Sequence, residues 1–344
     1  MDNDARTIYA RAMPSVKNEL LGDLLKATSR SFYLTLRVLP AAVRPQIGLA
    51  YLLARTTDTI ADTEVLPLEQ RLAALQALAA RIAGTAVAPL NFGELARCQG
   101  QPAERTLLEK AEASLALLSS LTPGDLALVR TVLQTITSGQ ELDLRRFAGA
   151  DGQNIIALEQ EAELDDYTYR VAGCVGEFWT RLCRAHLFPT VALDEAQLLA
   201  DGIRFGQGLQ LVNILRDLPA DLQQGRCYLP RTSLAAVGLA PETLWLPGSE
   251  SRFLPLFHQY LDRAEAHLRA GWVYTNTLPR GCVRVRLGCA WPILIGLRTI
   301  AKLRAARGAE LRQRVKISRR EVRGILARTL VNYPFPGAWQ RLVR

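Results

Sequence analysis

The sequence predicts an all-α protein that folds as a single-domain bundle of helices. Leu and Ala dominate its 344 residues, and apolar residues recur at intervals of three and four, which is the spacing of one helix face. Helix start signals accompany this spacing, and no convincing run of alternating apolar and polar residues occurs in the sequence. The chain is 49% hydrophobic, so it can bury a large core.

A buried helix is expected over the run IGLAYLLARTTDTIADTE. Its mostly apolar face contains Ile47, Tyr51, Leu52, Ala54 and Arg55 at helical spacing. Further apolar faces consist of Leu68, Leu72, Leu75, Ala79 and Ile82, then Leu107, Leu108, Ala111, Leu115 and Leu118, and then Leu126, Val129, Leu133 and Ile136. Each of these faces predicts one more helix.

Capping signals and one loop separate the expected helices. Thr122 and Pro123 supply an N-cap and an N1 proline for one helix. Ser318 and Glu321 form a capping-box pattern at the start of another. The segment TAVAPLNFGELARCQGQPAE, near residues 85–104, is too apolar for a disordered hinge, and we expect it to be a surface loop between helices.

Two Asp-x-x-x-Asp pairs are the most informative motifs of the chain. Asp58 and Asp62 close the first apolar run, and Asp217 and Asp221 follow a second one much later. Residues four apart project from the same helix face, so each pair can offer two carboxylates to a hard cation. Magnesium prefers carboxylate oxygens, waters and phosphate oxygens. A single pair of this kind is usually a solvated helix face, but together the two pairs predict a two-sided metal–diphosphate site.

The second pair belongs to a polar stripe on a helix. Gln210, Asn213, Asp217 and Asp221 would form this stripe, while the other side of the helix would be buried by Leu209, Val212, Leu215 and Leu218. Pro219 lies between the two acids and lacks a backbone N–H group, so it either begins a kink or marks the last turn of the helix.

Acids on two inward helix faces imply a bundle with a central apolar cavity. The carboxylates would lie at the mouth of this cavity, and the apolar side chains deeper on the same helices would line it. Such a cavity suits a hydrocarbon tail attached to a charged head.

The composition argues against several other classes of protein. Six cysteines without a C-x-x-C motif, together with only three histidines, are a poor supply of zinc or iron–sulfur ligands and fit reduced, mostly buried thiols. Gly206-x-Gly208 lies in a helical pattern with no preceding strand, so no Rossmann unit is expected. The N-terminus resembles no signal peptide, and the apolar stretch Leu287–Leu297 is too short to span a membrane. We therefore expect a cytoplasmic protein.

Positive charge is concentrated near the C-terminus. Residues 298–328 hold eleven Lys and Arg against Glu310 and Glu321. Such a tract is usually a solvated face, but it could also lie on an anionic membrane at the inner face. A nucleic-acid-binding protein is the alternative from another class, since the sequence pI is about 9.5. That alternative leaves both acid pairs unexplained, so we expect no nucleic-acid partner. A purely scaffolding helical bundle is a further alternative.

Four motifs in order resemble the squalene/phytoene synthase family. They are Ser29-Arg30-Ser31-Phe32, the DTIAD acids, Tyr167-x-x-x-Val171-Ala172-Gly173-x-Val175-Gly176 and Asn213-x-x-Arg216-Asp217-x-x-x-Asp221, and the likeness runs from about residue 25 to 300. The resemblance implies one all-α isoprenoid synthase domain over residues 1–344. Residues 1–20 would be an N-terminal extension, and residues 298–344 a basic C-terminal segment.

The same resemblance implies a reaction. Members of the family condense two prenyl diphosphates head to head with Mg²⁺, and LGCAWPILIGLRTIAKL followed by RVKISRRE is most like the squalene synthases among them. These convert two farnesyl diphosphates through presqualene diphosphate to squalene, with a hydride from NADPH. A dehydrosqualene or phytoene synthase, which lacks the hydride step, is the nearest alternative. We expect a monomer.

The resemblance and the helix faces together assign roles to individual residues. Metal ligands are expected at Asp58, Asp62, Asn213, Asp217 and Asp221. Substrate-binding residues are expected at Ser29, Arg30, Ser31, Tyr51, Arg55, Gln210, Asn213, Arg216 and Arg226. Tyr167 is expected to act with the four aspartates in catalysis, and Arg314 and Lys316 to contact NADPH.

Structural alternatives exist for several of these residues. Each arginine could simply pair with a neighbouring acid. The serines of SRSF could cap a helix, and Tyr167 could be a buried tyrosine that is hydrogen-bonded to the backbone.

Overall fold

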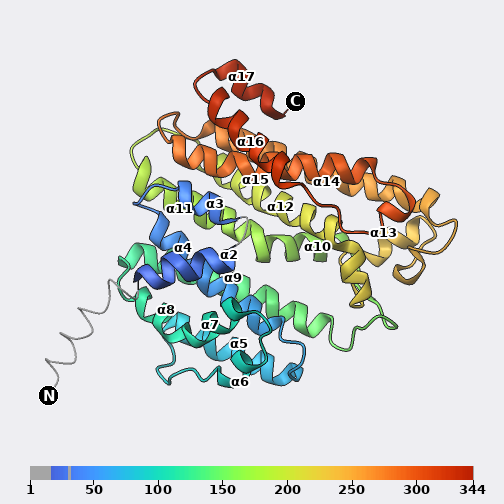
Figure 1. Ribbon diagram of the computed structural model, residues 1–344, viewed down its shortest axis with the longest axis horizontal. Coiled ribbons are helices and arrows are strands. Elements are labelled where there is room, and N and C mark those ends of the chain that lie inside the picture. Colours follow the sequence, from blue (N-terminus) through green and yellow to red (C-terminus); the bar gives the residue numbers. More distant parts are fainter. Residues whose placement is uncertain (1–16, 30–31, 344) are drawn as a thin grey trace, which may run out of the picture. The chain divides into compact units, whose positions relative to one another are not determined.

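The structure is a computed structural model that describes residues 17–29 and 32–343 (Figure 1). Helices account for most of the described chain, which confirms the all-α prediction. The contacts within the chain divide it into two compact units, residues 1–144 and 145–344.

The first unit is built around one buried helix, α4, which contacts α2, α5, α7 and α8. Leu52, Leu53 and Ile60 of α4 are fully buried. The helices of this unit are η1 (Glu19–Leu24), α2 (Leu25–Ser29), α3 (Phe32–Val38), α4 (Arg44–Ala61), α5 (Leu68–Ala83), α6 (Gly93–Arg97), α7 (Pro102–Glu109), α8 (Ala111–Leu118) and α9 (Pro123–Arg146), whose last two residues belong to the second unit.

Three details of the first unit differ from the sequence-based expectations. Leu20 is fully buried, so the fold begins before the end of the expected N-terminal extension. The single helix expected over residues 107–118 is two helices, because Lys110 between α7 and α8 leaves the helical conformation at φ −96° and ψ 11°. The expected loop near residues 85–104 contains α6, whose residue Leu95 is buried.

In the second unit, the long helix α12 packs against α11, α14 and α15. The helices of this unit are α10 (Glu161–Thr168), the π-helix η2 (Tyr169–Gly173), α11 (Cys174–Leu187), α12 (Glu195–Gln223), α13 (Arg231–Ala236), η3 (Pro241–Thr243), α14 (Glu250–Thr277), α15 (Val283–Ala305), η4 (Gly308–Glu310), α16 (Arg319–Asn332), α17 (Pro336–Gln340) and η5 (Arg341–Val343). None of the described helices is both long and apolar enough to cross a membrane.

Small residues let α12 approach its neighbours closely. A Cβ atom on Gly176 would collide with the carbonyl of Gly202, and one on Gly206 would collide with the carbonyl of Ala172. The backbones of α11 and η2 therefore touch the backbone of α12. This contact holds the segment that begins at Tyr167 against the polar stripe of α12.

One short strand pair interrupts the helical pattern. The strand β1 (Ile156–Ala157) pairs in parallel with β2 (Arg226–Cys227), with Ile156 opposite Arg226. Arg226, an expected substrate-binding residue, therefore lies in a strand. Each of the two strands is only two residues long.

Both capping predictions are confirmed. The hydroxyl of Thr122 accepts a hydrogen bond from the N–H of Asp125 at 3.2 Å. Ser318 and Glu321 form the complete capping box of α16. Four of the six cysteines are buried and all six are free, as expected for reduced thiols, and burial raises the pKa of Cys174 and Cys227 to about 12.

Candidate active site

The first Asp pair lies at the C-terminal end of α4. Asp58 is in the last turn, and Asp62 follows directly after the helix with its N–H bonded to the carbonyl of Asp58 at 2.9 Å. The side chain of Asp58 is 48% exposed, and Asp62 is exposed, while Ile60 between them is fully buried. Both carboxylates of this pair are therefore accessible to a cation from solvent.

Arg55 bridges Asp58 and Glu104. Its guanidinium lies 2.6 Å from Asp58 and 2.5 Å from Glu104 of α7. Burial favours the neutral form of Arg55, but the two acids more than offset this effect and hold its pKa above the ordinary value. Arg55 thus carries a full positive charge one turn before Asp58, and the alternative that it pairs with a neighbouring acid is confirmed for this structure.

Gln140 is a neighbour of Asp58 that the sequence-based assignment missed. Its amide donates a hydrogen bond from Nε2 to Oδ1 of Asp58 at 3.1 Å. Gln140 is buried, and within the described residues its Oε1 has no hydrogen-bond partner. In the sequence, Gln140 follows Leu133, Ile136 and Thr137 at helical spacing. A polar residue on this buried face of α9 was the available signal.

The SRSF motif is described only in part, because Arg30 and Ser31 lie outside the described residues. Ser29 is buried at the end of α2, and its hydroxyl donates to the carbonyl of Leu25 within the same helix. Tyr51 of α4 stacks on Phe32 at 5.2 Å, and its hydroxyl donates to the carbonyl of Thr28 at 3.2 Å. Tyr51 therefore holds this motif against α4.

The second Asp pair lies near the end of α12. Asp217 and Asp221 are both helical, and α12 continues through Pro219 to Gln223, so the proline marks the last turns of the helix and does not end it between the acids. Along the stripe, Nδ2 of Asn213 donates to Oε1 of Gln210 at 3.3 Å. The expected polar stripe is therefore continuous, whereas Leu209 on the opposite side is only half-buried.

Asp217 lies between two arginines. Arg216, its neighbour in the sequence, donates to both carboxylate oxygens at 2.9 and 2.5 Å. Arg314, from the segment between η4 and α16, lies 2.6 Å from Oδ1 and 3.2 Å from Oδ2. Arg216 thus pairs with an acid, as its structural alternative proposed. The contact of Arg314 places one of the two residues assigned to NADPH on the acid motif instead.

Tyr167 belongs to a buried aromatic group. Its ring stacks on Tyr228 with 4.6 Å between centroids, and Phe147 meets Tyr228 edge-on at 5.2 Å. The hydroxyl of Tyr167 accepts from Nε2 of Gln210 at 3.5 Å, which connects this group to the polar stripe of α12. Tyr228 and Phe147 were not assigned from the sequence. Neither residue belongs to a motif of the sequence, so no local signal marked them.

Arg226 and Lys316 are the remaining assigned cations in the described chain. Arg226 is half-buried in β2. Lys316 is exposed, and its carbonyl accepts from the ammonium of Lys302 at 3.2 Å.

The described side chains fit Mg²⁺ as pairs of hard oxygen ligands. Each Asp pair supplies two carboxylates, and the buried Oε1 of Gln140 adds a free oxygen beside Asp58. Among the residues described by the structure, no group of three or more His, Cys, Asp or Glu side chains could hold a metal by itself. At each pair, phosphate oxygens and water would have to complete the coordination.

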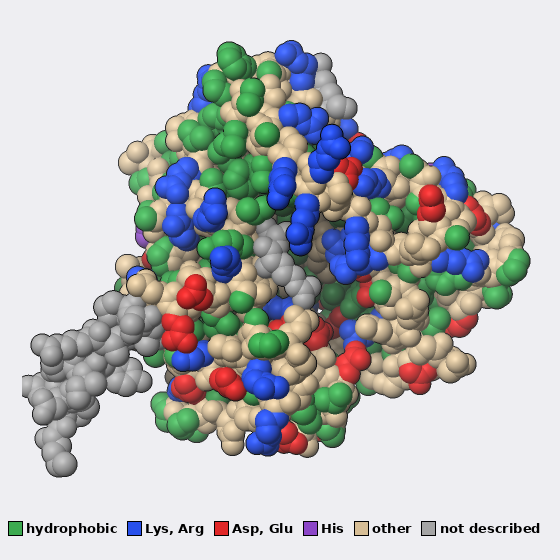
Figure 2. Space-filling view, viewed as in Figure 1, with side chains coloured by type: hydrophobic (Ala, Val, Ile, Leu, Met, Phe, Trp, Pro, Cys, Tyr) green, Lys and Arg blue, Asp and Glu red, His purple; other side chains and the backbone are tan. Residues whose placement is uncertain are grey.

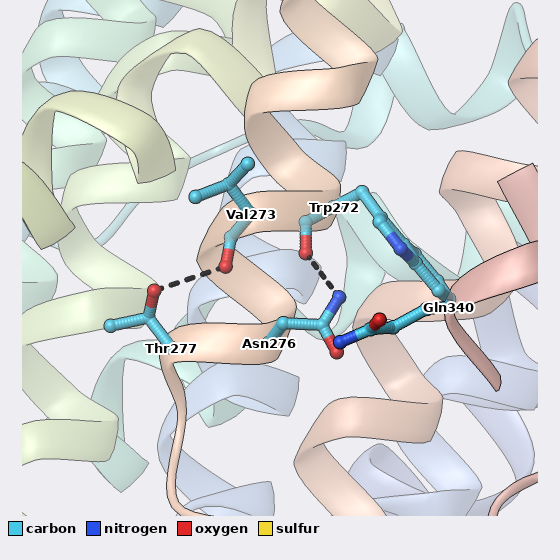
Figure 3. Close-up of a pocket in the computed structure, with 5 residues that line it drawn as sticks. All are labelled: Trp272, Val273, Asn276, Thr277 and Gln340. Carbon is cyan, nitrogen blue, oxygen red and sulfur yellow. Dashed lines mark hydrogen bonds between the residues drawn. The ribbon is translucent and has the colours of Figure 1, made fainter. Parts of the chain in front are cut away.

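A surface pocket of about 410 Å³ lies elsewhere, beside α14 and α17 (Figure 3). It is lined by Trp272, Val273, Asn276, Thr277 and Gln340 and contains no carboxylate. Asn276 donates to the carbonyl of Trp272 at 2.8 Å, and Thr277 donates to that of Val273 at 3.1 Å. With these donors already bonded to the backbone, the pocket does not resemble a metal–diphosphate site. The expected central apolar cavity stays a prediction.

Comparison with known proteins places the chain in a family. The family model of squalene/phytoene synthases matches residues 25–321. A presqualene diphosphate synthase of Rhodopseudomonas palustris is 31% identical over 258 residues, which cover 75% of this chain and 78% of that protein. Another from Sinorhizobium fredii is 30% identical over 305 residues, which cover 88% of this chain and 93% of that protein.

A solved structure agrees with this placement at the level of the fold. The complex of TcSQS with the ligand BPH1237 superposes with a TM-score of 0.77 at 21% identity and covers 95% of this chain and 89% of that chain. The family consists of prenyltransferases that bind prenyl diphosphates and condense them head to head. With the motif order, the helical fold and these matches in agreement, the chain belongs to the squalene/phytoene synthase family.

Proposed function

We propose that this chain condenses two molecules of farnesyl diphosphate to presqualene diphosphate with the aid of Mg²⁺. The observation that carries the proposal is the pair of carboxylates at the C-terminal end of each of two helices, at Asp58/Asp62 and Asp217/Asp221, with guanidinium groups bound directly to Asp58 and Asp217. The names of the two bacterial relatives favour this product class.

The reaction begins with the loss of a diphosphate. The allylic C1–O bond of one substrate breaks, and both electrons leave with the diphosphate oxygen. When bound, Mg²⁺ compensates the negative charge that develops on this leaving group. Each Asp pair would hold metal, and the amides beside it, Gln140 at the first pair and Asn213 on the stripe of the second, would orient the oxygens around it.

The arginines next to the acids would supply additional charge. Arg55 and Arg216 are within 2.6 and 2.5 Å of carboxylates, so they are positioned to contact phosphate oxygens once those carboxylates bind a metal. Each guanidinium would then release its carboxylate and bind a phosphate oxygen. Ser29, Arg30, Ser31, Tyr51 and Arg226 remain proposed substrate-binding residues.

The second half of the condensation forms a cyclopropane. The double bond of the other farnesyl chain attacks the allylic cation, a proton is lost, and the ring closes, so that one diphosphate and one proton are released for each product. The π-faces of Tyr167 and Tyr228 can stabilise a nearby carbocation. Diphosphate is a stronger base than a phenol, so the hydroxyl of Tyr167 would steady the cation or relay the proton rather than remove it alone.

Reduction to squalene with NADPH is the second candidate function. It is favoured by the basic segment that contains Lys316, which is exposed and free of acid partners within the described residues. Because Arg314 is engaged with Asp217, hydride donor binding at this segment would require Arg314 to leave that carboxylate.

Product analysis tests these proposals. The purified chain would be incubated with Mg²⁺ and either farnesyl or geranylgeranyl diphosphate, with and without NADPH, and the products identified by mass spectrometry before and after phosphatase treatment. Presqualene diphosphate in both reactions supports the first proposal, and squalene only with NADPH supports the second. Phytoene from geranylgeranyl diphosphate, with no product from farnesyl diphosphate, would contradict both.

A further inference from the structure

One face of α16 and of the turn after it stands out on the surface of the second unit. Residues 319, 320, 323, 327, 328, 330 and 331 are exposed, and Ile325 and Thr329 are buried on the opposite side. This spacing of three and four residues defines one outward helix face. We call its charged and apolar residues, together with Phe335, the C-terminal face: Arg319, Arg320, Arg323, Arg328, Leu330, Val331 and Phe335.

The C-terminal end of this face is apolar. Leu330, Val331 and Phe335 are 54%, 68% and 62% exposed. Figure 2 shows apolar side chains gathered over α16 and α17, with Lys and Arg beside them. Single exposed apolar residues are ordinary, but three large ones within six positions form a patch that is costly to leave in water.

The patch is held rigidly from below. The ring of Trp339 stacks on Trp272 at 5.0 Å and meets Tyr333 edge-on at 4.9 Å. Arg286 is buried and lies 5.5 and 5.7 Å from the ring centres of Tyr333 and Trp339. The hydroxyl of Tyr333 donates to the carbonyl of Arg280 at 2.6 Å. Phe335, between two prolines, is therefore presented on an ordered turn that loses little conformational freedom on binding.

The arginines of the face have no acidic partners. Residues 266–344 contain seventeen Lys and Arg but only Glu310 and Glu321 as acids. Glu321 is taken by Arg298 and Lys302 at 3.0 and 2.8 Å. Within the described chain, no carboxylate lies at ion-pair distance from any of the four arginines of the C-terminal face. Their charge is available to an anionic partner.

We propose that the C-terminal face docks on an anionic lipid bilayer. Arginines and large apolar side chains share one helix face, which is the pattern of a helix that lies in the plane of a membrane surface. The face runs about 16 Å along the helix from Arg320 to Val331 at 1.5 Å per residue. The three N-terminal arginines would contact lipid phosphates while Leu330, Val331 and Phe335 enter the boundary of the acyl chains.

Two other occupants fit this face less well. In a symmetric dimer that buries it, the arginines of the two copies would lie near one another without acids to separate them. Nucleic acid would satisfy the arginines but leave the aliphatic side chains of Leu330 and Val331 without a partner. The proposal is independent of which isoprenoid the chain produces.

Vesicle co-sedimentation of the full chain tests the proposal. The probe is a set of vesicles of phosphatidylcholine alone or mixed with phosphatidylglycerol, at low and high salt. We expect binding to the mixed vesicles only, weakened by salt. The triple variant Arg319→Gln, Arg320→Gln, Arg323→Gln should lose about fivefold in partition for each arginine removed. The variant Leu330→Ser, Phe335→Ser should lose at least about tenfold.

Matched variants act as controls. Arg97→Gln, Arg105→Gln, Arg252→Gln removes three exposed arginines that have no ion pair in the structure, and Val65→Ser, Val87→Ser removes two exposed apolar residues. Both should bind vesicles like the original chain, and circular dichroism should show unchanged helicity for all variants.

Several results would overturn the proposal. These are no binding of the original chain to the mixed vesicles, equal losses in the control variants, or binding that survives both changes to the face. Analytical ultracentrifugation that shows a dimer disrupted by Phe335→Ser would assign the face to a second copy of the chain. Binding of RNA but not of vesicles would assign it to nucleic acid.

Discussion

The two Asp pairs share one spacing but differ in what surrounds them. Asp58 contacts one arginine and the neutral amide of Gln140, and that arginine is shared with Glu104. Asp217 is held by two arginines, and no other acid shares them among the ion pairs of the described residues. The positive charge beside Asp58 is therefore offset by Glu104, whereas the two guanidinium groups beside Asp217 exceed the charge of that carboxylate.

This difference has a chemical consequence. A carboxylate whose charge is already compensated by two guanidinium groups binds a cation less readily than one with a single shared arginine. The first pair is thus the better of the two for binding Mg²⁺ before diphosphate arrives. At the second pair, an incoming Mg²⁺–diphosphate complex can offer Arg216 and Arg314 new anionic partners in exchange for Asp217. We infer that the second pair favours the metal together with diphosphate.

The largest expected effect comes from removing one carboxylate at either pair. Asp58→Asn and Asp217→Asn should each lower kcat by on the order of 10³-fold, because charge stabilisation of the leaving group depends on the metal. Steady-state diphosphate release measures this, and circular dichroism should show unchanged helicity. Near-normal turnover in either variant would remove that pair from the proposed mechanism.

The next largest effect concerns stability. Arg55→Gln leaves Glu104, whose side chain is only 16% exposed, without its cation, and should lower the free energy of unfolding by about 2 kcal/mol. Arg314→Gln is the matched control at the other pair. The side chain of Arg314 is 50% exposed, so its removal should cost no more than about 0.5 kcal/mol. Denaturant titrations of both variants provide the measurement, and equal losses would contradict the contrast.

The variant Arg314→Gln, which should cost little stability, should have a clear effect on metal affinity. Arg314→Gln removes one of the two cations on Asp217 and should tighten Mn²⁺ or Mg²⁺ binding in the absence of diphosphate by about fivefold. Isothermal titration calorimetry measures this without catalysis. Unchanged or weaker binding in Arg314→Gln would show that the contact of Arg314 with Asp217 does not compete with the metal.

The amides of the two sites allow the finest test. Gln140→Leu removes a buried hydrogen bond of 3.1 Å to Asp58 and should lower kcat/KM by about tenfold. Gln210→Leu removes a contact of 3.5 Å to Tyr167 and should lower it by about threefold or less. Gln140→Glu, tested beside them, adds a charge next to Asp58 and should strengthen metal binding. A larger loss of kcat/KM in Gln210→Leu than in Gln140→Leu would contradict this order.

Local features of the site were predictable from the sequence because they depend on helix geometry alone. The positions of Asp58 at the end of α4 and of Gln210, Asn213 and Asp217 on one stripe of α12 follow from spacings of three and four residues. The effect of Pro219 did not follow from spacing, since a proline can be accommodated where the rest of the helix is packed on both sides. In the structure Pro219 is buried, and α12 continues past it to Gln223.

By itself, the sequence determined the helical class, the capped helix starts and the two acid pairs, since each depends on residues within a few positions of one another. Only the tertiary structure decided that Asp58 meets Gln140 and that Arg55 meets Glu104, and that Asp217 meets Arg314 and Tyr167 meets Tyr228. These partners are far apart in the chain. Their meeting depends on how whole helices pack, for which hydrophobic burial supplies the free energy but no local pattern specifies the pairing.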